Sequence, residues 1–101
     1  MKFRHGIYQV LNKKENRMYL KTSVDLDRAF NADVFQLKAG MHSNKALQED
    51  WNLLGQEYFE FKIFDELNVK GTETKAEINK ELKELLELHL AELIKDGQLL
   101  Y

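Results

Sequence analysis

The sequence contains no cysteine, and this absence removes several kinds of chemistry at once. Without thiols, the chain has no disulfide framework, no thiolate nucleophile and no cysteine-ligated zinc site. It also lacks any apolar run long enough to cross a bilayer. The first residues are strand-like and are interrupted by Arg4 and His5, so they do not resemble a signal peptide. We therefore expect a soluble, cytoplasmic protein with no membrane partner.

The rest of the composition fits one globular domain covering residues 1–101. Hydrophobic residues make up 44% of the chain and charged residues 32%, which allows a modest core and argues against disorder. Residues 1–48 hold nine Lys and Arg against four Asp and Glu, whereas residues 49–101 hold six against thirteen. A basic first half suits phosphate binding. Attraction between the two halves within the fold would explain the same asymmetry.

Hydrophobic periodicity predicts three strands and three helices. The two alternating stretches at the start are separated by a short polar turn, which indicates a β-hairpin. The expected strands cover residues 3–11, 18–22 and 58–64, and the expected helices cover residues 25–37, 44–54 and 75–96. This order, ββααβα, predicts an α+β fold in which a small, mostly antiparallel three-stranded sheet is flanked by three helices.

Three segments in this order carry a recognisable residue pattern. Gly6-Ile7-Tyr8 begins the first expected strand, and Tyr19-Leu20-Lys21 lies on the second. Further along, residues 42–61 read HSNKALQEDWNLLGQEYFEF. Together these segments resemble the GIY-YIG nuclease superfamily, whose members show a GIY tripeptide, a YIG tripeptide shortly after it, and an H-x-N-x-x-L-Q-x-x-W-x-x-x-G-x-x-x-F-x-F stretch. The resemblance covers nearly the whole chain.

The resemblance implies hydrolysis of a DNA phosphodiester. In the family, a tyrosine or the water that it activates makes the attack, and an arginine stabilises the charge that develops on the phosphate. A glutamate on the last helix holds one divalent metal, which would be magnesium or manganese. Tyr8 matches the tyrosine of GIY and Tyr19 matches the tyrosine of YIG, so both are candidate catalytic residues.

Several positions depart from the family pattern near these tyrosines. The glycine of YIG is Lys21, whose side chain would project where the family keeps the backbone bare near the phosphate. The arginine position falls on Ala29, with Arg28 one residue early, and on a helix that shift turns the side chain by about 100°. The histidine often found four residues later is Asp33, which brings negative charge toward any phosphate.

The metal-binding glutamate is also in doubt. It falls on Leu86 if Leu90 is the apolar position near the end of the last helix, and on Glu87 if the register shifts by one. Loss of the arginine or of the metal ligand typically costs orders of magnitude in rate. We therefore expect a nuclease-like domain with a degenerate active site and no cofactor, which serves as a nucleic-acid-binding or interaction module.

Two other hypotheses stay open. A working metal-dependent DNA endonuclease would use Tyr8, Tyr19, Arg28 and Glu87, with magnesium or manganese. A structural protein would act through a protein partner or a second copy of the chain, docked on the leucine-rich helical segment 78–93. If the chain binds nucleic acid, the candidate phosphate contacts lie on the hairpin side and are Arg4, Lys13, Lys14, Arg17 and Lys21.

The residues near the motifs also have purely structural interpretations. Tyr8 and Tyr19 can pack a sheet face with their hydroxyls in water. His42 and Asn44 fit the start of a helix better than a metal or phosphate contact.

The same holds for the large aromatic side chains and for the last histidine. Trp51, Phe59 and Phe61 fit a hydrophobic core better than a base-stacking platform. His89 fits a partly buried side chain with a local partner better than a ligand.

Overall fold

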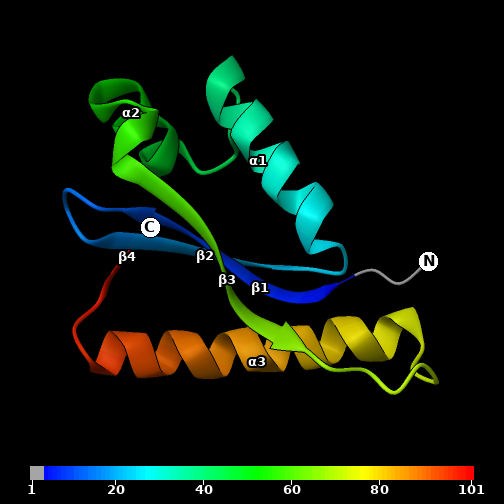
Figure 1. Ribbon diagram of the computed structural model, residues 1–101. Helices are drawn as coiled ribbons and strands as arrows, with labels where there is room; N and C mark the ends of the chain where they lie inside the picture. The colour runs from blue at the N-terminus through cyan, green and yellow to red at the C-terminus, as the bar shows by residue number, and fades with distance from the viewer. Residues whose placement is uncertain (1–3) are drawn as a thin grey trace.

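The computed structural model describes residues 4–101 as a sheet with helices on both faces (Figure 1). The strands are β1 (His5–Asn12), β2 (Arg17–Ser23), β3 (Phe59–Leu67) and β4 (Leu99–Leu100). The helices are α1 (Leu26–Ala39), α2 (Lys45–Leu54), the short 3-10 helix η1 (Gln56–Tyr58) and α3 (Lys75–Lys95). The strand order across the sheet is β3-β1-β2-β4, so the strand that carries the GIY tripeptide is central.

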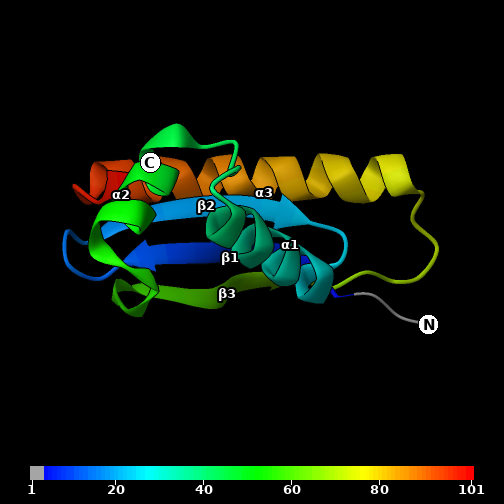
Figure 2. The same ribbon diagram turned by 90° about the horizontal axis from the view of Figure 1, so that it is seen from above.

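The three long helices are divided between the two faces of the sheet. Figures 1 and 2 show α1 and α2 on one face and α3 on the other. None of the helices formed by residues 4–101 has the length and apolar character needed to cross a bilayer. The expected α+β fold with three helices is confirmed.

The sheet differs from the expected one by a fourth strand. β1 pairs antiparallel with both β2 and β3, as predicted, but β4 adds a parallel pair in which Leu99 and Leu100 lie beside Arg17 and Met18 of β2. The prediction of three strands is therefore wrong. A two-residue strand is too short to show any periodicity, and it forms only because the chain returns to the sheet after α3.

Tyr101 shows what holds this returning segment in place. Its hydroxyl donates to Asp50 Oδ2 over 2.6 Å and accepts from Asn12 Nδ2 over 2.9 Å. Its backbone N–H donates to the Met18 carbonyl over 2.9 Å. The guanidinium of Arg17 lies over its ring, with 4.3 Å between the guanidinium carbon and the ring centroid. These polar contacts join β1, β2 and α2 to the last residue.

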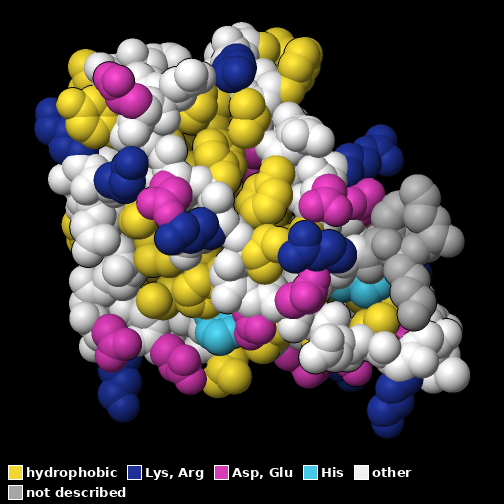
Figure 3. Space-filling model, viewed as in Figure 1, with side chains coloured by type: hydrophobic (Ala, Val, Ile, Leu, Met, Phe, Trp, Pro, Cys, Tyr) yellow, Lys and Arg dark blue, Asp and Glu magenta, His cyan; other side chains and the backbone are white. Residues whose placement is uncertain are grey.

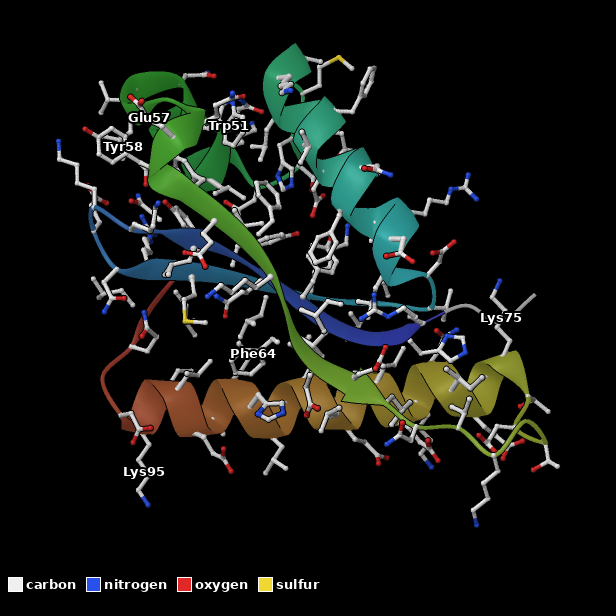
Figure 4. All side chains as sticks on the ribbon, in the orientation of Figure 1. Trp51, Glu57, Tyr58, Phe64, Lys75 and Lys95 are labelled. Atoms are coloured by element: carbon white, nitrogen blue, oxygen red, sulfur yellow. The ribbon has the colours of Figure 1, made fainter. Side chains whose placement is uncertain are left out.

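The main hydrophobic core lies between the sheet and the first two helices. One cluster of buried side chains joins the central strand to the helices and to β3: Val10, Leu37, Leu47, Trp51 and Phe59. Trp51 lies among the side chains beneath α2 (Figure 4), its ring centroid is 5.4 Å from that of Phe59, and Phe61 packs against this cluster. The core interpretation of these aromatic residues is confirmed.

A second layer of packing lies under the opposite face, against α3. Leu82 is 1% exposed and is the helix's one buried side chain. The Phe64 side chain points from β3 toward α3 (Figure 4), and its ring meets that of His89 edge-on, with centroids 4.9 Å apart. His89 Nε2 is 2.8 Å from Asp65 Oδ2, so the expected local partner of this half-buried histidine is confirmed.

Short polar side chains and glycines set the ends of α1 and α2. Asp25 caps α1 by accepting a hydrogen bond from the Arg28 backbone, and Gly40 ends it in a left-handed conformation with φ of 74°. Asn44 caps α2 by accepting from the Leu47 backbone over 3.1 Å, and Gly55 follows its last residue. The expectation that Asn44 stands at the start of a helix is confirmed.

Candidate functional site

The two candidate tyrosines lie on the same face of the sheet, under α1 and α2. Across the β1–β2 pair, Tyr8 is the partner of Lys21 and Val10 is the partner of Tyr19. Directly opposed residues of an antiparallel pair point to the same face, and so do residues two apart on one strand. Val10 belongs to the core beneath the first two helices, so Tyr8, Tyr19 and Lys21 all project toward that side.

Tyr8 is held in a buried hydrogen-bonded network rather than standing at the surface. The side chain is 1% exposed, and its hydroxyl donates to Oδ2 of Asp33, which α1 carries and which is 2% exposed. The other Asp33 oxygen, Oδ1, lies 3.1 Å from His42 Nε2. Phe30, one turn before Asp33, meets the Tyr8 ring edge-on with centroids 5.2 Å apart. The hydroxyl of Tyr8 therefore does not lie in water.

The loop before α2 fixes the proton on His42. The backbone N–H of Asn44 donates to His42 Nδ1 over 3.0 Å, so this nitrogen is an acceptor. The neutral ring then carries its proton on Nε2, which donates to Asp33. The His42 backbone N–H donates to Gln48 Oε1 over 3.0 Å, and Gln48 Nε2 donates to the Leu37 carbonyl over 3.0 Å. His42 is thus a bridge between α1 and α2.

The surroundings disfavour ionisation of both tyrosines. Burial raises the pKa of Tyr8 far above its ordinary value, and the hydrogen bond to the Asp33 carboxylate raises it further. Burial also raises the pKa of Tyr19, and the negative charge of Asp33 adds to that rise. An activated tyrosine nucleophile needs a shift in the opposite direction. Both hydroxyls therefore stay protonated at neutral pH.

Tyr19 is placed differently from Tyr8. Its side chain is half-buried, and its ring meets the His42 ring edge-on with centroids 5.4 Å apart. Within residues 4–101, no side chain or backbone group forms a hydrogen bond with its hydroxyl. Tyr19 thus contacts the network through its ring alone.

Arg28 and Ala29 lie in the first turn of α1, which is a regular helix. Arg28 is exposed and Ala29 is half-buried. Together with small or short side chains at the end of β2, they line an open hollow beside the helix, formed by Ser23, Val24, Asp25, Arg28, Ala29 and Ala32. We call it the α1 hollow. At the family's arginine position, the chain therefore presents a methyl group facing open space.

The candidate metal ligand lies on the other side of the sheet. Glu87 is exposed on α3, and Leu86 is half-buried on the same helix. Because α3 and α1 cover opposite faces, Glu87 and Arg28 are separated by the sheet (Figure 1). In the part of the chain from residue 4 onward, no three His, Asp or Glu side chains gather as a metal site would need. Tyr8 and Tyr19 lie on one face of the sheet, whereas Glu87 lies on the helix that covers the other face.

The candidate phosphate contacts are scattered, and two of them are engaged by the fold. Arg4 Nε lies 2.8 Å from Glu66 Oε1, and Arg17 Nε donates to the Leu100 carbonyl over 3.1 Å. Lys13 and Lys14 are exposed in the β1–β2 turn, and Lys21 is exposed on β2. Figure 3 shows Lys, Arg, Asp and Glu interspersed over this view of the molecule, with no single basic patch.

Gly6, the first residue of the GIY tripeptide, has a structural reason to be glycine. A Cβ added there would lie 2.3 Å from the Asp65 carbonyl oxygen and 2.9 Å from the Glu66 Cα. The β1–β3 register shifts between Ile7 and Tyr8, directly after this close approach. Gly6 therefore lets the backbone of β3 come closer than any residue with a side chain would allow.

The role of Asp33 is the feature that sequence reasoning missed. Asp33 falls on the apolar stripe of α1 with Leu26, Phe30 and Leu37, at helical spacing. A carboxylate on a buried stripe needs hydrogen-bond donors, and this is the signal that predicts a partner. The sequence alone does not say that the donors are Tyr8 and His42.

Comparison with solved structures finds close similarity to a nuclease domain. This chain is similar to the catalytic domain of the homing endonuclease I-TevI, with a TM-score of 0.63 and 30% sequence identity. The match covers 84% of this chain and 88% of the I-TevI domain. A mutant of the catalytic domain of the intron endonuclease I-TevI gives a TM-score of 0.59 and 29% identity, over 82% and 84% respectively. No protein-family model matches the sequence, and no curated protein matches it significantly.

Proposed function

Since this chain belongs to the GIY-YIG nuclease superfamily, we propose that it is a nuclease-like module that binds nucleic acid and has little or no power to cleave it. The observation that carries this proposal is the buried hydrogen bond from the Tyr8 hydroxyl to Asp33. A tyrosine that attacks, or that activates water, needs its oxygen at the surface where a phosphate can arrive. Here the oxygen is covered and its proton is held by a carboxylate.

The groups that would stabilise charge on a phosphate support the same proposal. Ala29 offers no guanidinium, and Asp33, which replaces the histidine of the pattern, is buried against Tyr8 and His42 and offers a phosphate no hydrogen-bond donor. Stabilising donors of this kind account for factors of about 10²–10³ in rate each. With both the arginine and the histidine of the pattern replaced, the remaining site lacks the means to stabilise the transition state.

The position expected for the metal ligand does not fit a divalent cation. Magnesium takes oxygen ligands, often one or two carboxylates completed by substrate phosphates. Leu86 supplies only hydrocarbon, and Glu87 is exposed on a helix that the sheet separates from Tyr8 and Arg28. An active endonuclease built from Tyr8, Tyr19, Arg28 and Glu87 would need those four groups around one phosphate, so we place this hypothesis second.

Binding can be tested without any cleavage. We expect the chain to bind a fluorescent duplex at about 50 mM salt, with an affinity that falls steeply as salt is added because phosphate contacts release counterions. Anisotropy titrations at several salt concentrations, with EDTA present, measure both quantities. A chain that leaves the duplex free even at the lowest salt concentration would contradict the binding half of the proposal.

Association through α3 stays a prediction. Leu88 and Ile94 on this helix are 56% and 64% exposed. Six residues apart on a helix, they point in directions about 120° apart rather than along one stripe. No single apolar surface on α3 therefore favours dimerisation over nucleic-acid binding.

A further inference from the structure

We propose that Lys21 is the phosphate-binding cation of this site, standing in for the guanidinium that the family pattern places at Ala29. The inference rests on the proposed function, because it names the group that holds the nucleic-acid backbone. In the sequence, the lysine at the glycine position of YIG and the alanine at the arginine position look like two independent departures from the family pattern. The structure brings them to the same side of the sheet.

The position of Lys21 follows from strand pairing. Its Cα is the partner of the Tyr8 Cα across β1 and β2. Directly opposed side chains in an antiparallel pair share a face and begin about 5 Å apart. Tyr19, two residues earlier on β2, points the same way. Lys21 thus starts beside both tyrosines, on the face that α1 and α2 partly cover.

The Lys21 ammonium is free to meet a ligand. The side chain is exposed, and within residues 4–101 none of the carboxylates forms an ion pair with it. By contrast, Arg4 pairs with Glu66, and the Arg17 guanidinium lies over the Tyr101 ring. Lys21 is therefore a more available cation than the arginines at either end of the hairpin.

The α1 hollow, which begins two residues beyond Lys21 along β2, supplies space for a phosphate. Ala29 and Ala32 leave it open, and Ser23, two residues after Lys21 on the same strand, lies in its wall. Arg28 lies in the wall as well, whereas the one acid there, Asp25, is occupied in capping α1. Arg28 in the wall and Lys21 two residues before Ser23, set against one engaged carboxylate, favour an anion in the hollow.

A lysine in this role explains binding without cleavage. A guanidinium grips a phosphate through a rigid fork of donors, whereas an ammonium on a flexible stem acts as a point charge. Lys21 would therefore hold the backbone without fixing the phosphorus in line with an attacking oxygen. Such a contact adds affinity but contributes little orientation.

The test is the salt dependence of duplex binding by Lys21→Ala. We expect the affinity to fall about tenfold at ~50 mM salt, and the slope of log K against log salt to shrink by about 0.9, the value of one phosphate contact. The matched control is Lys95→Ala, which removes the same charge at the far end of α3, where Figure 4 shows the side chain pointing away from the sheet. The control should keep the wild-type slope.

A rescue variant makes the test sharper. In Lys21→Ala combined with Ala29→Arg, the charge returns from the helix side, and the wild-type slope should return with it. Thermal melting of each variant checks that the fold is kept. If Lys21→Ala and Lys95→Ala give the same slope while the wild type binds, Lys21 is not the phosphate contact and the proposed function survives. If the wild type binds no duplex, both proposals fall.

Discussion

Gly6→Ala is expected to destabilise the domain by about 3 kcal/mol or more, the upper range of overpacking costs. The added methyl group would lie 2.3 Å from the Asp65 carbonyl oxygen and 3.2 Å from its carbonyl carbon. Both atoms are backbone of β3, so no side-chain rotation can relieve the contact. The strand pair that carries the GIY tripeptide would have to open at its register shift, between Ile7 and Tyr8.

Thermal unfolding measures this effect, because each kcal/mol shifts the Tm of a domain of this size by roughly 4–8 °C. The matched control is Gly71→Ala in the loop before α3. Gly71 has φ of 93° and open space around it, so its substitution costs only the backbone strain of about 1–2 kcal/mol. Equal Tm losses in the two variants would show that the close approach at Gly6 does not exist.

Asp33→Ala should lower the free energy of unfolding by a similar amount, about 3 kcal/mol, for a different reason. It leaves two buried donors without an acceptor, the Tyr8 hydroxyl and the His42 Nε2–H. Each buried group that loses its partner costs about 1–3 kcal/mol. The exposed Asp27, whose carboxylate lies 3.6 Å from Arg4, provides the control, because surface ion pairs contribute at most about 1 kcal/mol.

A double-mutant cycle separates the network from general damage at Asp33. In the Tyr8→Phe background, Asp33→Ala no longer leaves a hydroxyl without a partner, so it should cost about 1 kcal/mol less than in the wild type. Chemical denaturation of the four proteins gives this coupling free energy. A coupling of zero would mean that the hydrogen bond between Tyr8 and Asp33 contributes nothing to stability.

The fold could be predicted largely because its signals are local. Alternation predicts the three longer strands, and the ends of α1 and α2 depend on hydrogen bonds between residues close in sequence, such as that from the Leu47 backbone to Asn44. β4 left no such signal, because two residues pair with β2 only after the chain has folded back. The segment that follows β4 is held by the hydrogen bond from the Tyr101 hydroxyl to Asp50, two residues that are 51 positions apart in the sequence.

The candidate site was harder to predict, because it depends on which side chains meet. The sequence placed Tyr8 and Tyr19 on the hairpin and showed Asp33 where a histidine was expected. It treated Asp33 as a charge facing a phosphate, whereas the structure buries it against Tyr8 and His42. By contrast, the sequence predicts a helix over residues 25–37, and the regular geometry of α1 turns Arg28 away from the direction of Ala29 as that helix implies.

We propose that this GIY-YIG chain keeps the scaffold of the family and has little or no nuclease activity. The most direct measurement is the nicking of supercoiled plasmid DNA with magnesium or manganese, run beside Tyr19→Phe and Arg28→Ala, two changes at half-buried and exposed positions. We expect the wild type to produce no more nicks than either variant. Metal-dependent nicking by the wild type that disappears in both variants would contradict this proposal.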